Sequence, residues 1–207
     1  MFMPDKLTLF YTQHIAGDLA LLPHLYTFMQ ALRPQYAAHP LIVDLGDSCQ
    51  PDVWPCDVTG GRATLVVLDG MGYHAANVDN LLEAGSRQRL KNVISTAMID
   101  ANNLWRYDVP PERDEGIIVS LQPTPAMRLN IALAAADQTQ LAGKTLHLQA
   151  VRKAQVGVVQ VDLQRDDPRL ALHEVFTLPS GLKPAPTISA AVELVEDEAR
   201  FLQKRNS

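Results

Sequence analysis

The chain has 207 residues, of which 47% are hydrophobic and 20% are charged, and its formal net charge is −5. This is ordinary globular composition, and it excludes disordered and collagen-like chains. The acidic balance argues against nucleic acid as a partner, because nucleic-acid-binding domains usually carry a basic face. No apolar run approaches the roughly 18 residues that a membrane-spanning helix needs, so we expect no membrane partner.

The residues before Lys6 show no charged stretch followed by an apolar one, so we expect a cytoplasmic protein. Domains usually contain about 100–200 residues, so one domain over residues 1–207 is the expectation. The two cysteines are too few for a secreted disulfide framework.

The first half of the chain alternates strand-like and helix-like segments. The predicted strands are residues 6–12, 41–45, 75–78 and 92–97. The predicted helices are residues 19–37, with Pro34 near the end as a stop or kink, 61–71, opened by Gly61, and 81–90. Strand–helix alternation predicts a mostly parallel sheet covered by helices, and therefore an α/β fold.

The second half changes character. Its predicted strands are residues 116–121, 128–133, 145–150, 156–163 and 170–178, and short turns such as residues 164–168 favour antiparallel pairing. A last helix is predicted over residues 187–204, with Thr187 as its N-cap.

Polar residues follow the predicted parallel strands at the edge where open α/β sheets bind ligands. The three clearest strand ends read Thr12-Gln13-His14-Ile15-Ala16-Gly17, Asp44-Leu45-Gly46-Asp47 and Asn77-Val78-Asp79-Asn80-Leu81. With Met71-Gly72-Tyr73-His74-Ala75 between them, their order and spacing resemble the metallophosphoesterase (calcineurin-like) superfamily, in its 5′-nucleotidase-like branch. The resemblance implies a reduced sandwich of two mixed sheets flanked by helices.

The resemblance also implies a centre in which two metal ions, roughly 3.5–4 Å apart, clamp a phosphate. Asp47 keeps the position of the bridging ligand, Asn80 that of the amide ligand, and His14 stands where the family has its first aspartate. Ala16 and Leu81 replace the family's first and catalytic histidines, and the later Gly-His signatures are absent. We therefore assign no catalytic residue, and we expect either no cofactor or one weakly bound Mn, Fe or Zn ion.

Each of these residues also has a purely structural interpretation. Asp47 can order its loop, Asn80 can cap the helix that follows, and His14 can be an ordinary loop histidine. Cys49 and Cys56 can be soft ligands or a disulfide, but two reduced thiols are the preferred interpretation.

Two further features leave alternatives open. Gly60-Gly61-Arg62 can bind phosphate at a helix N-terminus, although a plain helix start is favoured. Trp54 and Trp105 either pack in the interior or line the mouth of the site.

The function that the sequence favours is that of a degenerate metallophosphoesterase-like protein without efficient phosphatase activity. It would act by binding an unknown small molecule or protein partner. The alternative is a phosphoesterase for phosphomonoesters or nucleotides, with a mononuclear or rebuilt metal site. A third hypothesis is a homo-oligomer that associates through the edge of the second sheet.

Overall fold

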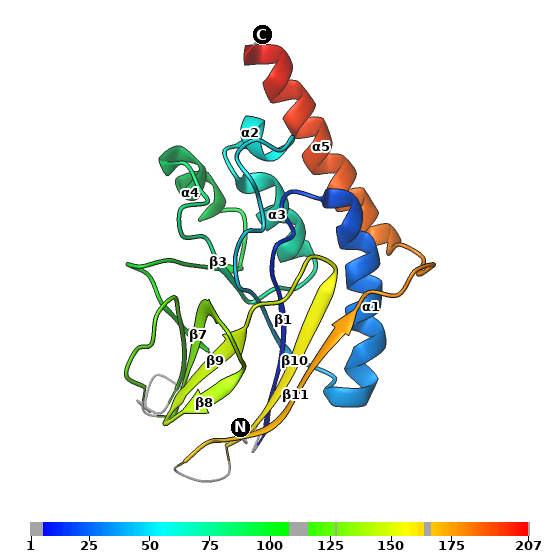
Figure 1. Cartoon of the computed structure of the whole chain (residues 1–207). Coiled ribbons are helices and arrows are strands. Elements are labelled where there is room, and N and C mark those ends of the chain that lie inside the picture. The colour runs from blue at the N-terminus through cyan, green and yellow to red at the C-terminus, as the bar shows by residue number, and fades with distance from the viewer. Residues whose placement is uncertain (1–5, 108–115, 127, 164–166, 207) are drawn as a thin grey trace.

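The computed structural model describes residues 6–107, 116–126, 128–163 and 167–206 (Figure 1). The strands are β1 (Lys6–Thr12), β2 (Leu41–Asp44), β3 (Ala75–Asn77), β4 (Ala97–Ile99), β5 (Trp105–Tyr107), β6 (Ile117–Ser120), β7 (Leu129–Ala136), β8 (Gln140–Ala142), β9 (Thr145–Gln149), β10 (Gln155–Asp162) and β11 (Arg169–Thr177). The helices are η1 (Leu19–Leu21, a 3-10 turn), α1 (Leu22–Tyr36), α2 (Cys56–Thr59), α3 (Arg62–Gly70), α4 (Ala84–Leu90) and α5 (Pro186–Asn206).

The strands form two mixed sheets. The first has the order β11-β10-β1-β2-β3-β4, in which β1 to β4 are parallel and β10 and β11 pair antiparallel at one side. The parallel sheet predicted for the first half is therefore confirmed. In this register Thr12 lies beside Asp44, so the carboxyl ends of β1 and β2 meet at the same edge.

The second sheet has the order β5-β6-β7-β9-β8. Here the expected antiparallel pairing is wrong for the centre of the sheet, because β6 pairs parallel with β7 and β7 pairs parallel with β9. For β7 and β9 the reason is β8, which forms an antiparallel hairpin with β9 through a tight turn at Gly143 and so returns the chain beside β7 in the parallel direction.

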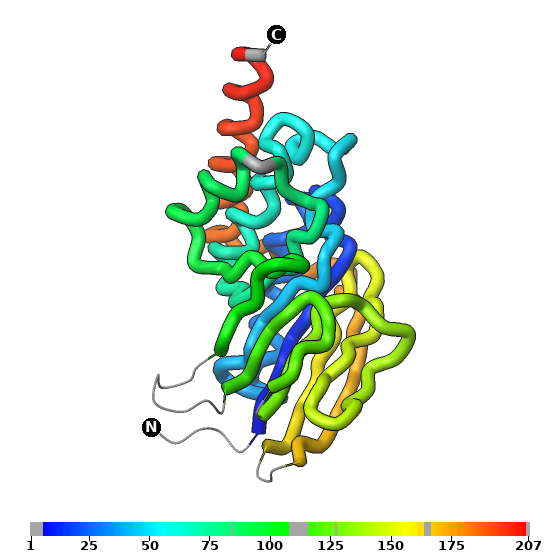
Figure 2. Tube along the Cα trace, turned by 90° about the vertical axis from the view of Figure 1, so that its left-hand side faces the viewer, coloured from blue at the N-terminus to red at the C-terminus, as the bar shows by residue number. Residues whose placement is uncertain are grey.

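Two cores lie on opposite faces of the first sheet. The helix-side core packs α1, α3 and α5 on one face, with Leu25 and Met29 of α1 and Val192 and Val195 of α5 among its buried residues. The intersheet core lies between the two sheets. The apolar side chains of β1 alternate between the two cores, so the strand is buried on both faces. The two views agree on this arrangement of helices, first sheet and second sheet (Figure 1 and Figure 2). The predicted fold class is confirmed.

Several predicted boundaries change. The helix predicted over residues 19–37 begins as the 3-10 turn and continues as α1 past Pro34 to Tyr36. The helix predicted from Leu81 starts at Ala84, and the strand predicted at 92–97 begins only at Ala97. Thr187 lies inside α5 rather than capping it. The turn expected at 164–168 falls partly outside the described residues.

In the part of the chain that the structure describes, no helix combines the length and apolar character needed to cross a membrane.

Candidate functional site

The loops that follow β1, β2 and β3 form one edge of the first sheet, which we call the mouth (residues 13–18, 45–49 and 78–81). The first two loops are joined by backbone hydrogen bonds. The His14 amide donates to the Gly46 carbonyl (3.1 Å), and the Ala16 amide donates to the Asp47 carbonyl (2.8 Å). The Asn77 side chain donates to the Leu45 carbonyl (2.8 Å), which ties the third loop to the second. The mouth predicted from the strand ends is therefore a connected surface.

The backbone of the mouth is unusual. Five non-glycine residues in the described chain have a positive φ angle, and four of them are His14, Ala16, Asp47 and Asn80, at 56–58°. Left-handed backbone costs an L-residue roughly 1–2 kcal/mol. Backbone of this kind clusters at active sites and ligand clamps, where it can pre-organise the site. Ala16 adopts this conformation with no functional group to direct.

His14 and Asp47 are in direct contact at the mouth. The distance from His14 Nδ1 to Asp47 Oδ2 is 2.9 Å, and the two side chains are 47% and 59% exposed. Two donor atoms that bind one ion at roughly 2.1 Å each, at right angles, also lie about 3 Å apart. The pair therefore has the separation of a hydrogen bond and equally that of two ligands of a single ion.

Asn80 is less well placed. Its side-chain amide donates to Asp79 Oδ2 (2.9 Å), and among the described residues no hydrogen bond or ion pair joins it to His14 or Asp47. The interpretation of Asn80 as a helix N-cap is wrong, because Glu83 occupies the N-cap position of α4.

Beneath the mouth lies a buried polar network that the sequence reasoning missed. Asp44 is fully buried; its Oδ1 accepts from the Thr12 hydroxyl (3.1 Å), and its Oδ2 accepts from the Gly46 amide (3.1 Å). The Thr12 hydroxyl also contacts the Tyr73 hydroxyl (2.9 Å). Burial raises the pKa of the Asp44 carboxyl well above its usual range, and these hydrogen bonds only partly oppose the effect. The available signal was a single carboxylate in the apolar run of residues 41–45.

The expectation of two reduced thiols is wrong, because Cys49 and Cys56 form a disulfide. Their Cα atoms are 5.7 Å apart, within the range that a disulfide spans. The chain turns back between them and starts α2 at Cys56, and both cysteines are buried. A Cβ added at Gly17 would lie 2.7 Å from Cys56 Sγ, so the disulfide packs directly against the mouth. Bonded sulfurs are no longer thiolates, which removes both cysteines from any ligand set.

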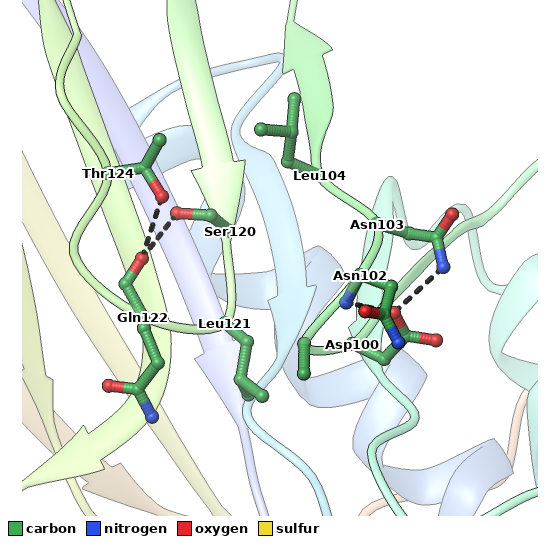
Figure 3. A pocket seen from close by; sticks show the side chains of 9 residues that line it. Asp100, Asn102, Asn103, Leu104, Ser120, Leu121, Gln122 and Thr124 are labelled. Carbon is green, nitrogen blue, oxygen red and sulfur yellow. Dashed lines mark hydrogen bonds between the residues drawn. The ribbon is translucent and has the colours of Figure 1, made fainter.

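One small cavity lies where β4 and β6 end (Figure 3). It measures about 180 Å³ and is lined by Asp100–Leu104, Ser120–Gln122 and Thr124. The Ser120 and Thr124 hydroxyls both donate to the Gln122 carbonyl. Burial alone would raise the pKa of the Asp100 carboxyl, but hydrogen bonds from Asn103 and Asn102 and the Arg87 charge lower it. Among the side chains drawn in Figure 3, Asn103 donates to the Asp100 carboxylate, whereas Ser120 and Thr124 bond to the backbone of Gln122.

A larger cavity, which we call the Trp54 cavity, shares residues 16–18 with the mouth. It measures about 480 Å³ and is lined by Ala16–Ala20, Gln50, Val53–Pro55, Lys153 and Glu196. Trp54 is 38% exposed, and the Arg200 guanidinium lies over its ring, 5.9 Å from the centroid. Lys153 Nζ pairs with Asp18 Oδ2 at 2.6 Å. No local sequence signal could have found this cavity, because its walls come from distant segments.

The Gly60-Gly61-Arg62 segment and Trp105 have structural roles. Arg62 is buried and donates to Glu198 Oε1 (2.7 Å) and Ser86 Oγ (3.3 Å), so it ties α3 to α5 and α4. Gly61 is the N-cap of α3, as a plain helix start requires. Trp105, on β5, packs against the rings of Tyr107 on the same strand and of His74, and it does not line the Trp54 cavity.

Architecture and mouth together define a metallophosphoesterase-like fold. The solved structures similar to this chain include the calcineurin-like phosphoesterase YfkN from Bacillus subtilis, with a TM-score of 0.60, 10% identity, and coverage of 96% of this chain and 99% of that one. They also include the 5′-nucleotidase precursor from Thermus thermophilus, with a TM-score of 0.59, 13% identity, and coverage of 96% of this chain and 60% of that one. No protein-family model matches the sequence, and no curated protein matches it significantly.

The donor atoms at the mouth do not fit a two-metal centre. Such a centre needs oxygen and imidazole ligands that converge on both ions from several strand ends. Here His14 and Asp47 are in contact, whereas Ala16 and Leu81 offer no ligand atom. Across the described ranges, no group of three or more His, Cys, Asp or Glu residues is placed to hold a metal ion.

Proposed function

We propose that this chain binds a ligand at the mouth of a metallophosphoesterase-like fold and does not hydrolyse phosphate esters efficiently. The observation that carries the proposal is the composition of the mouth. Its position at the strand ends and its left-handed turns support a ligand site. Among the described residues, however, His14 and Asp47 are the two ionisable candidate ligands in contact. Hydrolysis by a metal pair needs more ligands than these residues supply.

The test is metal content together with turnover. We expect the purified protein, after incubation with Mn²⁺ and dialysis, to retain far less than one equivalent of metal. We also expect it to leave p-nitrophenyl phosphate and bis-p-nitrophenyl phosphate intact. Two bound ions with metal-dependent turnover would contradict the proposal.

A phosphoesterase with a mononuclear site is the second candidate, and the 2.9 Å contact between His14 and Asp47 favours it. This site would use His14 Nδ1, an Asp47 oxygen and the Asn80 amide oxygen. About one equivalent of Mn, Fe or Zn, lost in Asp47→Ala but kept in the control Asp52→Ala, would support the enzyme. Asp52 is exposed on the same segment and belongs to no candidate ligand set, so it controls for loss of surface charge.

The remaining expectations are proposals as well: one domain over residues 1–207, a cytoplasmic location, and a small-molecule or protein partner other than nucleic acid. The Cys49–Cys56 disulfide counts against the cytoplasm, where thiols are kept reduced. Association through the second sheet would use β5 or β8, its edge strands of three residues each. Such short edges disfavour sheet extension, and a monomeric mass in solution would exclude it.

A further inference from the structure

The Trp54 cavity has the size and position of a ligand site. Ligand pockets usually measure roughly 300–1,000 Å³, and this cavity measures about 480 Å³. It adjoins the mouth, because Ala16 belongs to both and its amide donates to the Asp47 carbonyl. The disulfide holds the segment that carries Trp54 against the mouth loop.

The walls of the cavity indicate what kind of ligand it takes. Leu19, Ala20, Val53 and Pro55 provide apolar surface beside the Trp54 ring. A Trp ring attracts cations through its negative face, and Arg200 already lies over this ring in the described structure. Apolar walls beside an aromatic ring suit the methyl groups of an alkylated ammonium better than a strongly hydrated ion.

The charges around the cavity also favour a cationic ligand. Lys153, the cation in the wall, is paired with Asp18, so it is not available to bind an anion without breaking that pair. Glu196 in the wall and the neighbouring Asp197 share the single cation Arg200. These groups comprise three carboxylates (Asp18, Glu196 and Asp197) and two cations (Lys153 and Arg200). Their sum is one negative charge.

We propose that the Trp54 cavity binds a small organic cation with an alkylated ammonium group, which stacks on Trp54 and is attracted by Glu196. The inference rests on the proposed function, since it names the ligand class for the mouth. The ammonium competes with Arg200 for the Trp54 ring and for Glu196, whereas Asp197 remains as a partner of the Arg200 guanidinium. Its methyl groups lie against the apolar wall.

The test uses choline as the cationic probe, with inorganic phosphate and glucose as anionic and neutral probes. In the Trp105→Phe variant, Trp54 is the remaining tryptophan, so its fluorescence reports on this cavity alone. We expect a saturable change with choline and none with phosphate or glucose. Calorimetry on Trp54→Leu should then show that choline binding is lost.

Charge variants on α5 make the test specific. Removing an exposed charge partner is worth about two- to fivefold in affinity. Glu196→Gln should therefore raise the Kd for choline about two- to fivefold, whereas Glu193→Gln, exposed on the same helix but outside the cavity, should leave it unchanged.

Absence of saturable choline binding, tighter binding of phosphate or glucose, or equal effects of the two glutamate variants would overturn the inference. Hydrolysis of p-nitrophenyl phosphate is measured on the same samples. Metal-dependent turnover would overturn the proposed function, whereas failure of choline to bind without turnover would overturn only the ligand class.

Discussion

Asp44 and Asp47 leave the same strand end three residues apart, and their surroundings are opposite. Asp44 is fully buried in the hydrogen-bond network with Thr12, Gly46 and Tyr73. Burial raises the pKa of the Asp44 carboxyl and so favours its neutral form. Asp47 is 59% exposed and contacts His14. The edge of the sheet therefore has a buried structural layer below and a solvent-exposed layer above, and a single short turn separates the two.

Removing each carboxyl in turn should give the largest difference between the two layers. Asp44→Ala leaves the Gly46 amide and Thr12 hydroxyl without their acceptor, and should lower the free energy of unfolding by about 2–4 kcal/mol. Asp47→Ala removes an exposed pair and should change it by less than about 1 kcal/mol. Urea denaturation of both variants measures the difference; equal effects would show that the two layers do not exist.

The next largest effect is expected from the disulfide, which packs against the exposed layer at Gly17. The Cys49→Ala, Cys56→Ala double variant opens a loop with a sequence separation of 7, for which chain entropy predicts a loss of about 2–3 kcal/mol. Thermal unfolding of the wild type with and without a reducing agent gives the same comparison without mutation. A double variant as stable as the oxidised wild type would contradict the assignment.

The protonation of Asp44 should make stability depend on pH. Because the pKa of this carboxyl is raised in the folded protein, its contribution to stability is present at low pH and is lost as the pH rises through the folded value. Relative to Asp44→Asn, the wild type should therefore lose stability as the pH rises above about 4, with a slope of at most about 1.4 kcal/mol per pH unit. Asp52→Asn, at an exposed position outside this network, is the matched control for the loss of one acidic group.

The smallest effect concerns the backbone of the mouth. Ala16→Gly relieves a left-handed alanine and should stabilise the protein by about 0.5–1 kcal/mol. Ala20→Gly, in the neighbouring 3-10 turn, has no positive φ to relieve and should destabilise instead. Differential scanning calorimetry resolves the opposite signs, and destabilisation by both changes would argue against the strained turn.

The sequence predicted the parts of the fold in which burial follows a simple pattern. β1 is buried on both faces and β10 carries valines into both cores, and each reads as a segment rich in apolar and β-branched residues. Once β1 and β2 are placed as parallel neighbours, the loops that follow them, with His14 and Asp47, must lie at the same edge of the sheet. The contact between these two loops could therefore be predicted from the sequence.

The mistakes have physical causes that lie outside local patterns. Leu81 and Leu82 read as the start of a helix, but they pack against the helix-side core from a loop. The strand expected from residue 92 begins later because the Asp69 carboxylate accepts hydrogen bonds from the Ser95 and Thr96 amides. Lys153 and Glu196 come to the Trp54 cavity from distant segments, and only the folded chain shows that they share it.

The left-handed backbone at Ala16 has a practical consequence. Side chains can be exchanged one at a time, whereas a loop conformation is established by many contacts together. Because His14, Ala16, Asp47 and Asn80 already adopt the constrained geometry, a protein engineer who wanted a cation-binding centre here would need to change side chains without redesigning the loops. The chain is thus a ready scaffold for grafting such a centre, and Ala16→His is the substitution with which to begin.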